Sequence, residues 1–463
     1  MLTIFLLMTQ AGFCHLREPS HYVIIDTDAA PDDLRTICTL LASPDIQVLA
    51  ITTSDGACSA QTGLKKVRAL LKTLHHEGVP TAAGINYLEK TPEIRAFCEQ
   101  IPWGKNSFTP LYDSTNAVSL IFQELELEDK KVTVLCLGSL TNIHTAVRKD
   151  TSILQHIKRI VWYNDYPMHE GFNYLLDQKA VEELSYMDVD IEAVTFFGEP
   201  YPMDSAFLMR TDNLNSVYAG AIVRAHNNKA VQGKIKDNHL KLWDDLVPVY
   251  LLTPMLFKEI VPRSMQPCRI YSPVNEKFVK EALLKILSVE EAFDNIVFED
   301  FPHAQSAFQD DVNQYRDSIL LKHGPAEWRI CVITNELHGH LGIYSLTGAK
   351  MGVRVREYLN IGLDKLKVLT FAGTHPPVSC LNDGIQVSTG ATLGHGLINV
   401  SEDSVIRPEA IFYYKNRAIR MRLKDKYWDI VKHDIQGIIK QHGKLTQRYW
   451  VEVRKLALQY WKD

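Results

Sequence analysis

The feature that most constrains the fold is a repeated alternation of short apolar runs with helical patterns over the first 300 residues. The apolar runs have strand length and lie at 22–26, 46–54, 132–139 and 157–165, and the helical patterns lie at 32–43, 60–78 and 140–150. Strands that alternate with helices predict a parallel sheet with helices on both faces. We therefore expect an α/β fold with a mostly parallel, Rossmann-like sheet.

The length of the chain indicates two domains, because 463 residues exceed what one ordinary core organises. Residues 21–305 hold the alternating pattern, and 306–323 are predicted to be a helical connector. From 324 to 463 the pattern changes to a helix, a His-Gly-His turn and a second helix, followed by Gly-, Thr- and His-rich sequence with strand-like flanks. We expect a smaller α+β domain there.

Composition excludes several classes of protein. Apolar residues make up 46% of the chain and charged residues 23%, which is typical of a globular protein. A formal net charge of -5 predicts no general affinity for nucleic acid or membranes. The eight cysteines form no CxxC pair, so a zinc ribbon or a thioredoxin-type site is not expected.

The first 20 residues carry an apolar run followed by small residues, as in the second half of a secretory signal. The run lacks a basic segment before it, so an N-terminal strand or a disordered start is the alternative. We favour export to a periplasmic or extracellular location over a cytoplasmic one. No later apolar run is long enough to span a bilayer.

Four aspartates follow the first predicted strand within eight residues: Asp26, Asp28, Asp32 and Asp33. Crowded carboxylates raise one another's pKa unless a cation neutralises them. Calcium takes six to eight oxygen ligands, including carboxylates and backbone carbonyls. One aspartate would suffice to cap the helix that follows, so the group as a whole predicts a divalent-cation site.

Five motifs in the same order resemble those of the inosine–uridine-preferring nucleoside hydrolases. They are IIDTDAAPDD, LASPDIQVLAITTSDG, VLCLGSLTNIHTAVRKD, GFNYLLDQKA and LWDDLVPVYLLTP, and the match extends over about residues 21–300. The resemblance implies the nucleoside hydrolase fold and calcium-dependent hydrolysis of a small-molecule riboside. Family members are commonly dimers or tetramers, so a homo-oligomer is expected.

The resemblance also implies roles for individual residues. Calcium would be held by the carboxylates of Asp28, Asp33 and Asp244 and by the backbone carbonyl of Leu137. Asp28 would also accept a proton from the attacking water. Asp32 would hydrogen-bond a ribose hydroxyl, and Asn173 would reach the ribose 5′ end.

The chain departs from the family pattern where the base is recognised. Ala57 replaces a ribose-binding Asn, and Gly171 replaces an acidic residue. Trp243 replaces the His that protonates the leaving base, and His239 lies four residues before it. Trp243 either stacks on an aromatic base or packs in the core. The segment 162–171 offers four other proton donors, and the sequence does not choose among Tyr163, Asp165, Tyr166 and His169.

Residues 325–400 resemble the family of the formylmethanofuran dehydrogenase E subunit. His338, His340 and Cys380 correspond to its metal site, which implies zinc or another transition metal. Gly342 stands where that family has a cysteine, and His375 and His395 are candidate substitutes. A glycine-rich turn with buried His and Cys is the alternative.

Three functional hypotheses follow. The first is a riboside hydrolase with a metal-binding C-terminal domain. The second is a ribosyl-binding protein in which catalysis has been altered. The third places the main chemistry in the C-terminal domain.

Overall fold

The structure is a computed structural model that describes residues 19–104, 116–214, 216–261, 268–289, 297–298, 301–302, 304–403 and 405–463. The chain divides into two compact units. The N-terminal unit comprises 19–294 and 357–360, and the C-terminal unit comprises the described residues of 295–356 and 361–463. The signal segment predicted for residues 1–20 lies outside the described residues, except for its last two.

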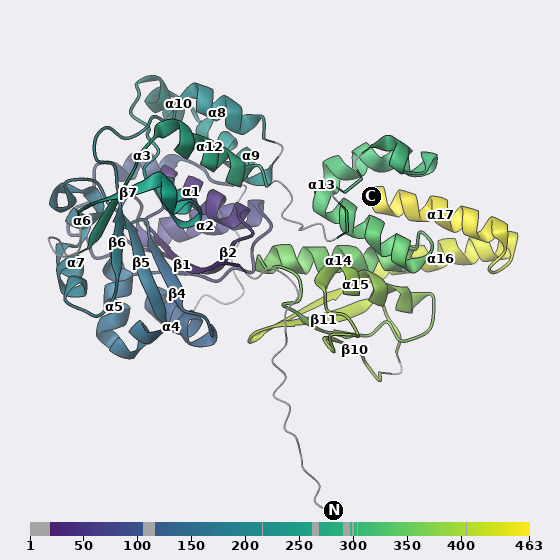
Figure 1. Cartoon of the computed structure of the whole chain (residues 1–463). Coiled ribbons are helices and arrows are strands. Elements are labelled where there is room, and N and C mark those ends of the chain that lie inside the picture. Colours follow the sequence, from purple (N-terminus) through teal and green to yellow (C-terminus); the bar gives the residue numbers. More distant parts are fainter. Residues whose placement is uncertain are drawn as a thin grey trace, which may run out of the picture. The chain divides into compact units, whose positions relative to one another are not determined.

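An eight-stranded sheet forms the centre of the N-terminal unit, in the order β3-β2-β1-β4-β5-β6-β8-β7 (Figure 1). All neighbouring strands are parallel except β7 and β8. The strands are β1 (His21–Thr27), β2 (Ile46–Thr53), β3 (Thr81–Ala83), β4 (Val132–Cys136), β5 (Ile157–Tyr163), β6 (Ile191–Val194), β7 (Phe257–Val261) and β8 (Arg269–Pro273).

Helices cover both faces of this sheet because its central strands are apolar on both sides. In β1, Val23 and Ile25 belong to one buried cluster, and Ile24 belongs to the other. The first cluster contains α1 (Pro31–Ala42), α2 (Ala60–Thr73), α8 (Ser205–Asp212), α9 (Val217–His226), α10 (Lys229–Lys236), α11 (Leu246–Leu252) and α12 (Glu276–Leu287). The second contains α4 (Ala117–Leu127), α5 (Thr141–Lys149) and α7 (Gln178–Ser185). Two short helices, α3 (Arg95–Gln100) and α6 (Phe172–Leu176), flank the carboxyl ends of the strands.

The C-terminal unit combines a small sheet with helices. The sheet has the order β10-β9-β11-β12, with β10 and β9 parallel and the other neighbours antiparallel. Its strands are β9 (Lys367–Thr370), β10 (Ile398–Val400), β11 (Glu409–Tyr414) and β12 (Arg417–Arg422). Its helices are α13 (Asp310–His338), α14 (Ile343–Leu359), α15 (Leu381–Thr389), α16 (Asp425–His442) and α17 (Gln447–Lys462).

The fold class predicted from the sequence is confirmed. The four predicted strands correspond to β1, β2, β4 and β5, and the three predicted helices correspond to α1, α2 and α5. In the C-terminal unit the predicted helix–turn–helix corresponds to α13 and α14, with the His-Gly-His turn at the end of α13. Within the described residues, no helix is long and apolar enough to cross a membrane.

Candidate active site

The turn between β1 and α1 brings the first carboxylates of the site together. Ala29 has a left-handed conformation with φ of 60°, which is uncommon for a residue other than glycine. The Asp33 carboxylate holds this turn, because its Oδ2 accepts hydrogen bonds from the backbone amides of Asp28 and Ala29, each at 3.1 Å. The Thr27 hydroxyl donates to the same oxygen. Asp33 therefore organises the turn that carries Asp28.

A third carboxylate reaches the same place from a distant part of the chain. Asp244 lies just before α11, and carboxylate oxygens of Asp32, Asp33 and Asp244 all lie within 4.8 Å of one another. Asp244 is 3% exposed, and its Oδ1 is buried without a hydrogen-bond partner among the described residues. A buried oxygen of this kind requires an explanation, because leaving it unpaired is costly.

Burial raises the pKa of every carboxyl in this group. The pKa of Asp28 rises from 3.8 to about 6, because burial and the charge of Asp32 outweigh the hydrogen bond from Ala57. The pKa values of Asp33 and Asp244 rise well above their ordinary value, through burial and the charges of neighbouring aspartates. For Asp32, burial raises the pKa against the opposing charge of Arg35.

The carboxylate oxygens of this group are suitable ligands for a hard divalent cation. All are oxygens, which calcium prefers, and a bound cation would remove the mutual repulsion that raises the pKa values. Oδ1 of Asp244, which has no hydrogen-bond partner among the described residues, would be a ligand for such an ion. Thiolate and imidazole ligands, which zinc favours, do not take part in this carboxylate group. The residues therefore fit the type of ion predicted from the sequence.

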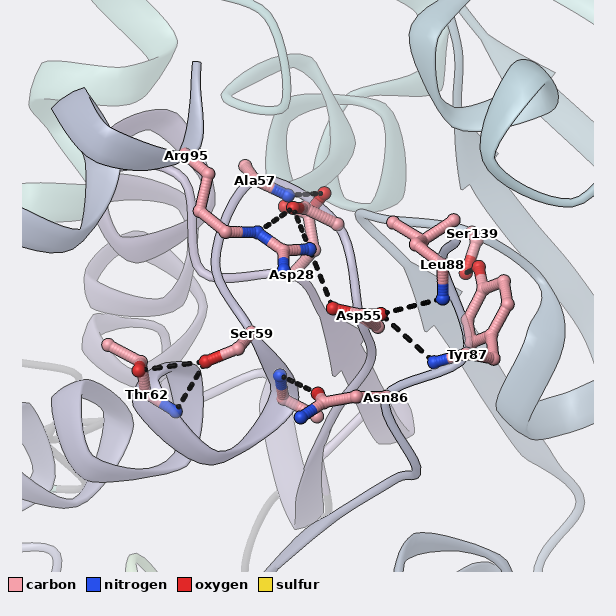
Figure 2. Close-up of polar contacts among 12 residues, drawn as sticks. Asp28, Asp55, Ala57, Ser59, Thr62, Asn86, Tyr87, Leu88, Arg95 and Ser139 are labelled. Atoms are coloured by element: carbon pink, nitrogen blue, oxygen red, sulfur yellow. Dashed lines mark hydrogen bonds and ion pairs between the residues drawn. The ribbon is translucent and has the colours of Figure 1, made fainter. Parts of the chain in front are cut away.

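Asp28 sits slightly apart from the three convergent carboxylates. Its Oδ2 accepts a hydrogen bond of 2.8 Å from the amide of Ala57, in the loop after β2 (Figure 2). That loop is itself held by Arg95, which pairs with Asp55 at 2.6 Å and donates to the carbonyl of Gly56. Ala57 thus retains a contact to the acidic site through its backbone, although it lacks the amide side chain of the family residue.

Leu137 and Asn173 meet beside the acidic residues. Leu137 follows β4, and its amide donates to the carbonyl of Asp26 at 2.8 Å. The Asn173 side chain, from α6, donates to the Leu137 carbonyl at 2.8 Å and to the Tyr163 carbonyl at 3.0 Å. Asn173 is 6% exposed, so its position is tightly defined. It fixes the orientation of the carbonyl that the family resemblance assigns to the metal.

The four aspartates, Leu137 and Asn173 all line one cavity of about 400 Å³. Its acidic lining consists of Asp28, Asp32, Asp33 and Asp244. Its lining also includes aromatic, apolar and charged residues: Glu93, Ile94, Phe97, Lys234, His239 and Trp243. Trp243 is half-buried, packs against the core and also lines the cavity, so the core contact is present and stacking on a base stays a prediction.

Some of the candidate proton donors line the cavity and others do not. Tyr163 and Asp165 line it, and the Tyr163 hydroxyl donates to Asp165 at 3.1 Å. Tyr166 and His169 are not among the lining residues: Tyr166 packs against Phe197, and His169 is an exposed neighbour of Glu170. His239, five residues before Asp244, lines the cavity.

In the C-terminal unit, the predicted metal residues are only partly assembled. The rings of His338 and His340 lie 4.3 Å apart, measured between centroids. Cys380 precedes α15 and is half-buried. Among the described residues, the aspartate group is the one set of three ligand atoms within 4.8 Å of one another, and it does not include these three residues.

Two charged groups near the predicted sites escaped the sequence reasoning. Arg35, in α1, makes a bidentate pair with Asp245 at 3.0 and 2.7 Å, directly beneath the acidic residues. Asp383 contacts His338 at 2.7 Å. The single basic residue of α1, two positions after Asp33, was the available signal for Arg35. For Asp383, the signal was its place three residues after Cys380, where one helical turn brings side chains onto the same face.

Comparison with known proteins gives two family matches. Residues 23–270 match the model of the inosine-uridine preferring nucleoside hydrolases, and 337–461 match FmdE, described as molybdenum formylmethanofuran dehydrogenase operon. Both resemblances expected from the motifs are confirmed.

Among curated relatives, a probable uridine nucleosidase 2 of Oryza sativa subsp. japonica is 33% identical over 147 residues, which is 30% of this chain and 43% of the relative. The inosine-uridine preferring nucleoside hydrolase of Leishmania major is 30% identical over 175 residues, covering 34% and 54%. The chain spans about half the length of the curated relatives it matches.

Solved structures of similar fold include a plant nucleoside hydrolase, with 19% identity and a TM-score of 0.49, covering 58% of this chain and 99% of that one. A nucleoside hydrolase from Bacillus anthracis has 17% identity and a TM-score of 0.49, covering 58% and 99%.

Proposed function

Since the chain belongs to the inosine-uridine preferring nucleoside hydrolase family, we propose that its N-terminal unit hydrolyses the N-glycosidic bond of a ribonucleoside or a related riboside, with calcium as the cofactor. The observation that carries the proposal is that four buried aspartates, three of them convergent, line a cavity of about 400 Å³. A cavity of this volume is within the usual range for a small-molecule site. When bound, calcium would lower the pKa of a water molecule and orient the ribose hydroxyls.

Asp28 is the proposed general base. Its carboxylate lines the cavity, and an ionised carboxylate can accept a proton from an attacking water. The Ala57 amide holds one of its carboxylate oxygens, Oδ2, in place. Asp32 is proposed to bind a ribose hydroxyl, and Asn173 is proposed to reach the 5′ end. Positive charge that develops on the sugar would be stabilised by the surrounding carboxylates.

The aromatic residues of the cavity support an aromatic leaving group. Phe97 and Trp243 are both half-buried and line the cavity, where they would contact a flat base. Stacked aromatic contacts contribute about 0.5–1.5 kcal/mol beyond burial of area.

We propose His239 as the donor that protonates the leaving base. Its side chain is exposed at the cavity, and no hydrogen bond to its ring is present among the described residues. Imidazole is the side chain most often used for general acid catalysis. Tyr163 is a weaker candidate, because its hydroxyl is engaged by Asp165 and burial raises its pKa well above the ordinary value.

The test of the base compares Asp28→Asn with Asp129→Asn, a matched change of an exposed aspartate in the same unit. Release of reducing sugar from a panel of ribosides is expected to fall about 10²–10⁴-fold for Asp28→Asn and to stay unchanged for Asp129→Asn. Equal turnover in both variants would contradict the mechanism.

The role of His239 is tested with a nitrophenyl riboside, whose phenolate leaves without protonation. His239→Gln should lose hydrolysis of nucleosides and keep hydrolysis of the nitrophenyl compound. Parallel losses on both substrates would point to a structural role instead.

Two alternatives remain distinct proposals. Trp243 and Ala57 favour a ribosyl-binding protein that does not hydrolyse its ligand, and calorimetry that finds binding without free base would support it. The partly assembled metal residues of the C-terminal unit favour chemistry located there. Chelation that removes only a transition metal and abolishes turnover would support that alternative.

A further inference from the structure

His338 is held by a carboxylate that the sequence did not connect to it. The residue ends α13, and its Nδ1 lies 2.7 Å from Oδ2 of Asp383 in α15. A carboxylate accepts hydrogen bonds and does not donate them when ionised. Nδ1 is therefore the protonated nitrogen, and in the neutral ring Nε2 carries the lone pair.

That lone pair has no partner. The His338 side chain is 9% exposed, and Nε2 is buried without a hydrogen bond among the described residues. Few buried polar nitrogens in folded proteins lack a partner, and each one requires a specific reason. A ligand that accepts the lone pair would supply that reason.

Gly342 lies against this edge of the His338 ring. A Cβ atom built on Gly342 would lie 3.2 Å from Nε2 and 2.7 Å from the Ser345 hydroxyl, so any larger residue would crowd the nitrogen. The ring centroid of His340 lies 4.3 Å from that of His338.

From this geometry we propose that Asp383 is a positioning residue of a transition-metal site in the C-terminal unit, where it holds His338 with Nε2 directed to the ion. The inference goes beyond the proposed hydrolase function, since it concerns a separate unit and different ligands. Metal-binding histidines usually donate their other N–H to a carboxylate or carbonyl, and this fixes both tautomer and ring orientation. Imidazole nitrogen suits zinc, cobalt and similar ions.

The test titrates the full-length protein with Co²⁺ after chelation, with excess calcium present to occupy the aspartate site. Four-coordinate Co²⁺ with nitrogen or sulfur ligands absorbs visible light strongly, whereas Co²⁺ bound only by oxygen absorbs weakly. Asp383→Ala is expected to weaken the strongly absorbing site by about 10–100-fold, and His338→Gln is expected to abolish it. Asp425→Asn changes an exposed carboxylate of the same unit and serves as the control.

An affinity for Co²⁺ in Asp383→Ala within about twofold of the wild type would overturn the proposal. So would the absence of the strong absorption in the wild type.

If Asp383→Ala fails to fold, the tautomer can be measured in the wild-type chain. Histidine labelled with ¹⁵N, assigned by the loss of its signals in His338→Gln, should show a protonated Nδ1 and an unprotonated Nε2 in the metal-free protein. The opposite tautomer would overturn the proposal. Sugar release plays no part in either readout, so the fate of the hydrolase proposal is decided separately.

Discussion

Arg35 carries a full charge into the interior of the N-terminal unit. It is 1% exposed, and besides Asp245 it contacts Nε2 of His226 at 3.1 Å and the carbonyl of Lys241 at 2.7 Å. Its positive charge also lowers the pKa of Asp32 and so opposes the effect of burial. The pair therefore joins α1, which carries Asp32, to the segment that carries Asp244.

Arg35→Met is expected to destabilise the N-terminal unit by about 3–5 kcal/mol, because it leaves the Asp245 carboxylate buried and unpaired. Urea unfolding would measure the loss. Arg210→Met breaks a pair of similar length, 2.7 Å, whose two side chains are about half exposed, and it should cause no measurable change. If the two variants lose the same stability, the buried pair has no special role.

The raised pKa values predict an unusual pH dependence for the metal-free protein. Burial raises the pKa of Asp26 to about 7 and that of Asp28 to about 6, from an ordinary value of 3.8. Between the ordinary and the raised values the folded state binds more protons than the unfolded state. The free energy of unfolding therefore falls as pH rises through this window.

Thermal unfolding of chelated protein between about pH 5 and about pH 7.5 should accordingly show a falling Tm for the N-terminal unit. Saturating calcium should flatten this fall, because it neutralises the carboxylates when they ionise. Identical pH profiles with and without calcium would contradict the assignment of the site.

At the scale of elements, the loop after β2 acts as a support for the acidic turn after β1. A Cβ on Gly56 would lie 2.2 Å from Oδ2 of Asp28 and 2.7 Å from its Cβ, so only glycine permits this approach. Arg95 binds the carbonyl of Gly56 and limits how far the loop can retreat (Figure 2).

Gly56→Ala is expected to displace the Asp28 carboxylate, at a cost of about 1–3 kcal/mol from overpacking. Calorimetry should detect weaker calcium binding, and sugar release should fall with it. Gly233→Ala is the control: a Cβ at this position in α10 meets nothing within 4 Å, and the change should stabilise the helix slightly. Calcium affinity that is unaltered by Gly56→Ala would argue against contact between this loop and the metal site.

At the scale of the molecule, each unit has its own sheet and its own candidate metal site. The aspartate site lies wholly in the N-terminal unit, and His338 and Asp383 both lie in the C-terminal unit. A ligand that binds only the folded form stabilises that form by about 2.7 kcal/mol at a hundredfold excess over Kd.

Calorimetry of the full chain should therefore show two unfolding transitions with separate responses. Calcium should raise the temperature of one, and zinc or cobalt should raise the temperature of the other. A single transition that responds equally to both ions would show that the units unfold together and would contradict independent sites.

The sequence alone was sufficient to predict the alternating strands and helices, the parallel sheet and the acidic ends of β1 and α1. These features depend on local periodicity and on residues adjacent in the chain. Asp28 and Asp33 fall within one turn, so their proximity follows from the secondary structure.

Only the tertiary structure decided which side chains meet across long separations. Arg35 pairs with Asp245 across 210 residues, and His338 meets Asp383 across 45. The tertiary structure also brought Asp32, rather than Asp28, into the tightest group with Asp33 and Asp244. Such contacts depend on how helices pack against a sheet and on which rotamers that packing permits, and no pattern within one segment encodes them.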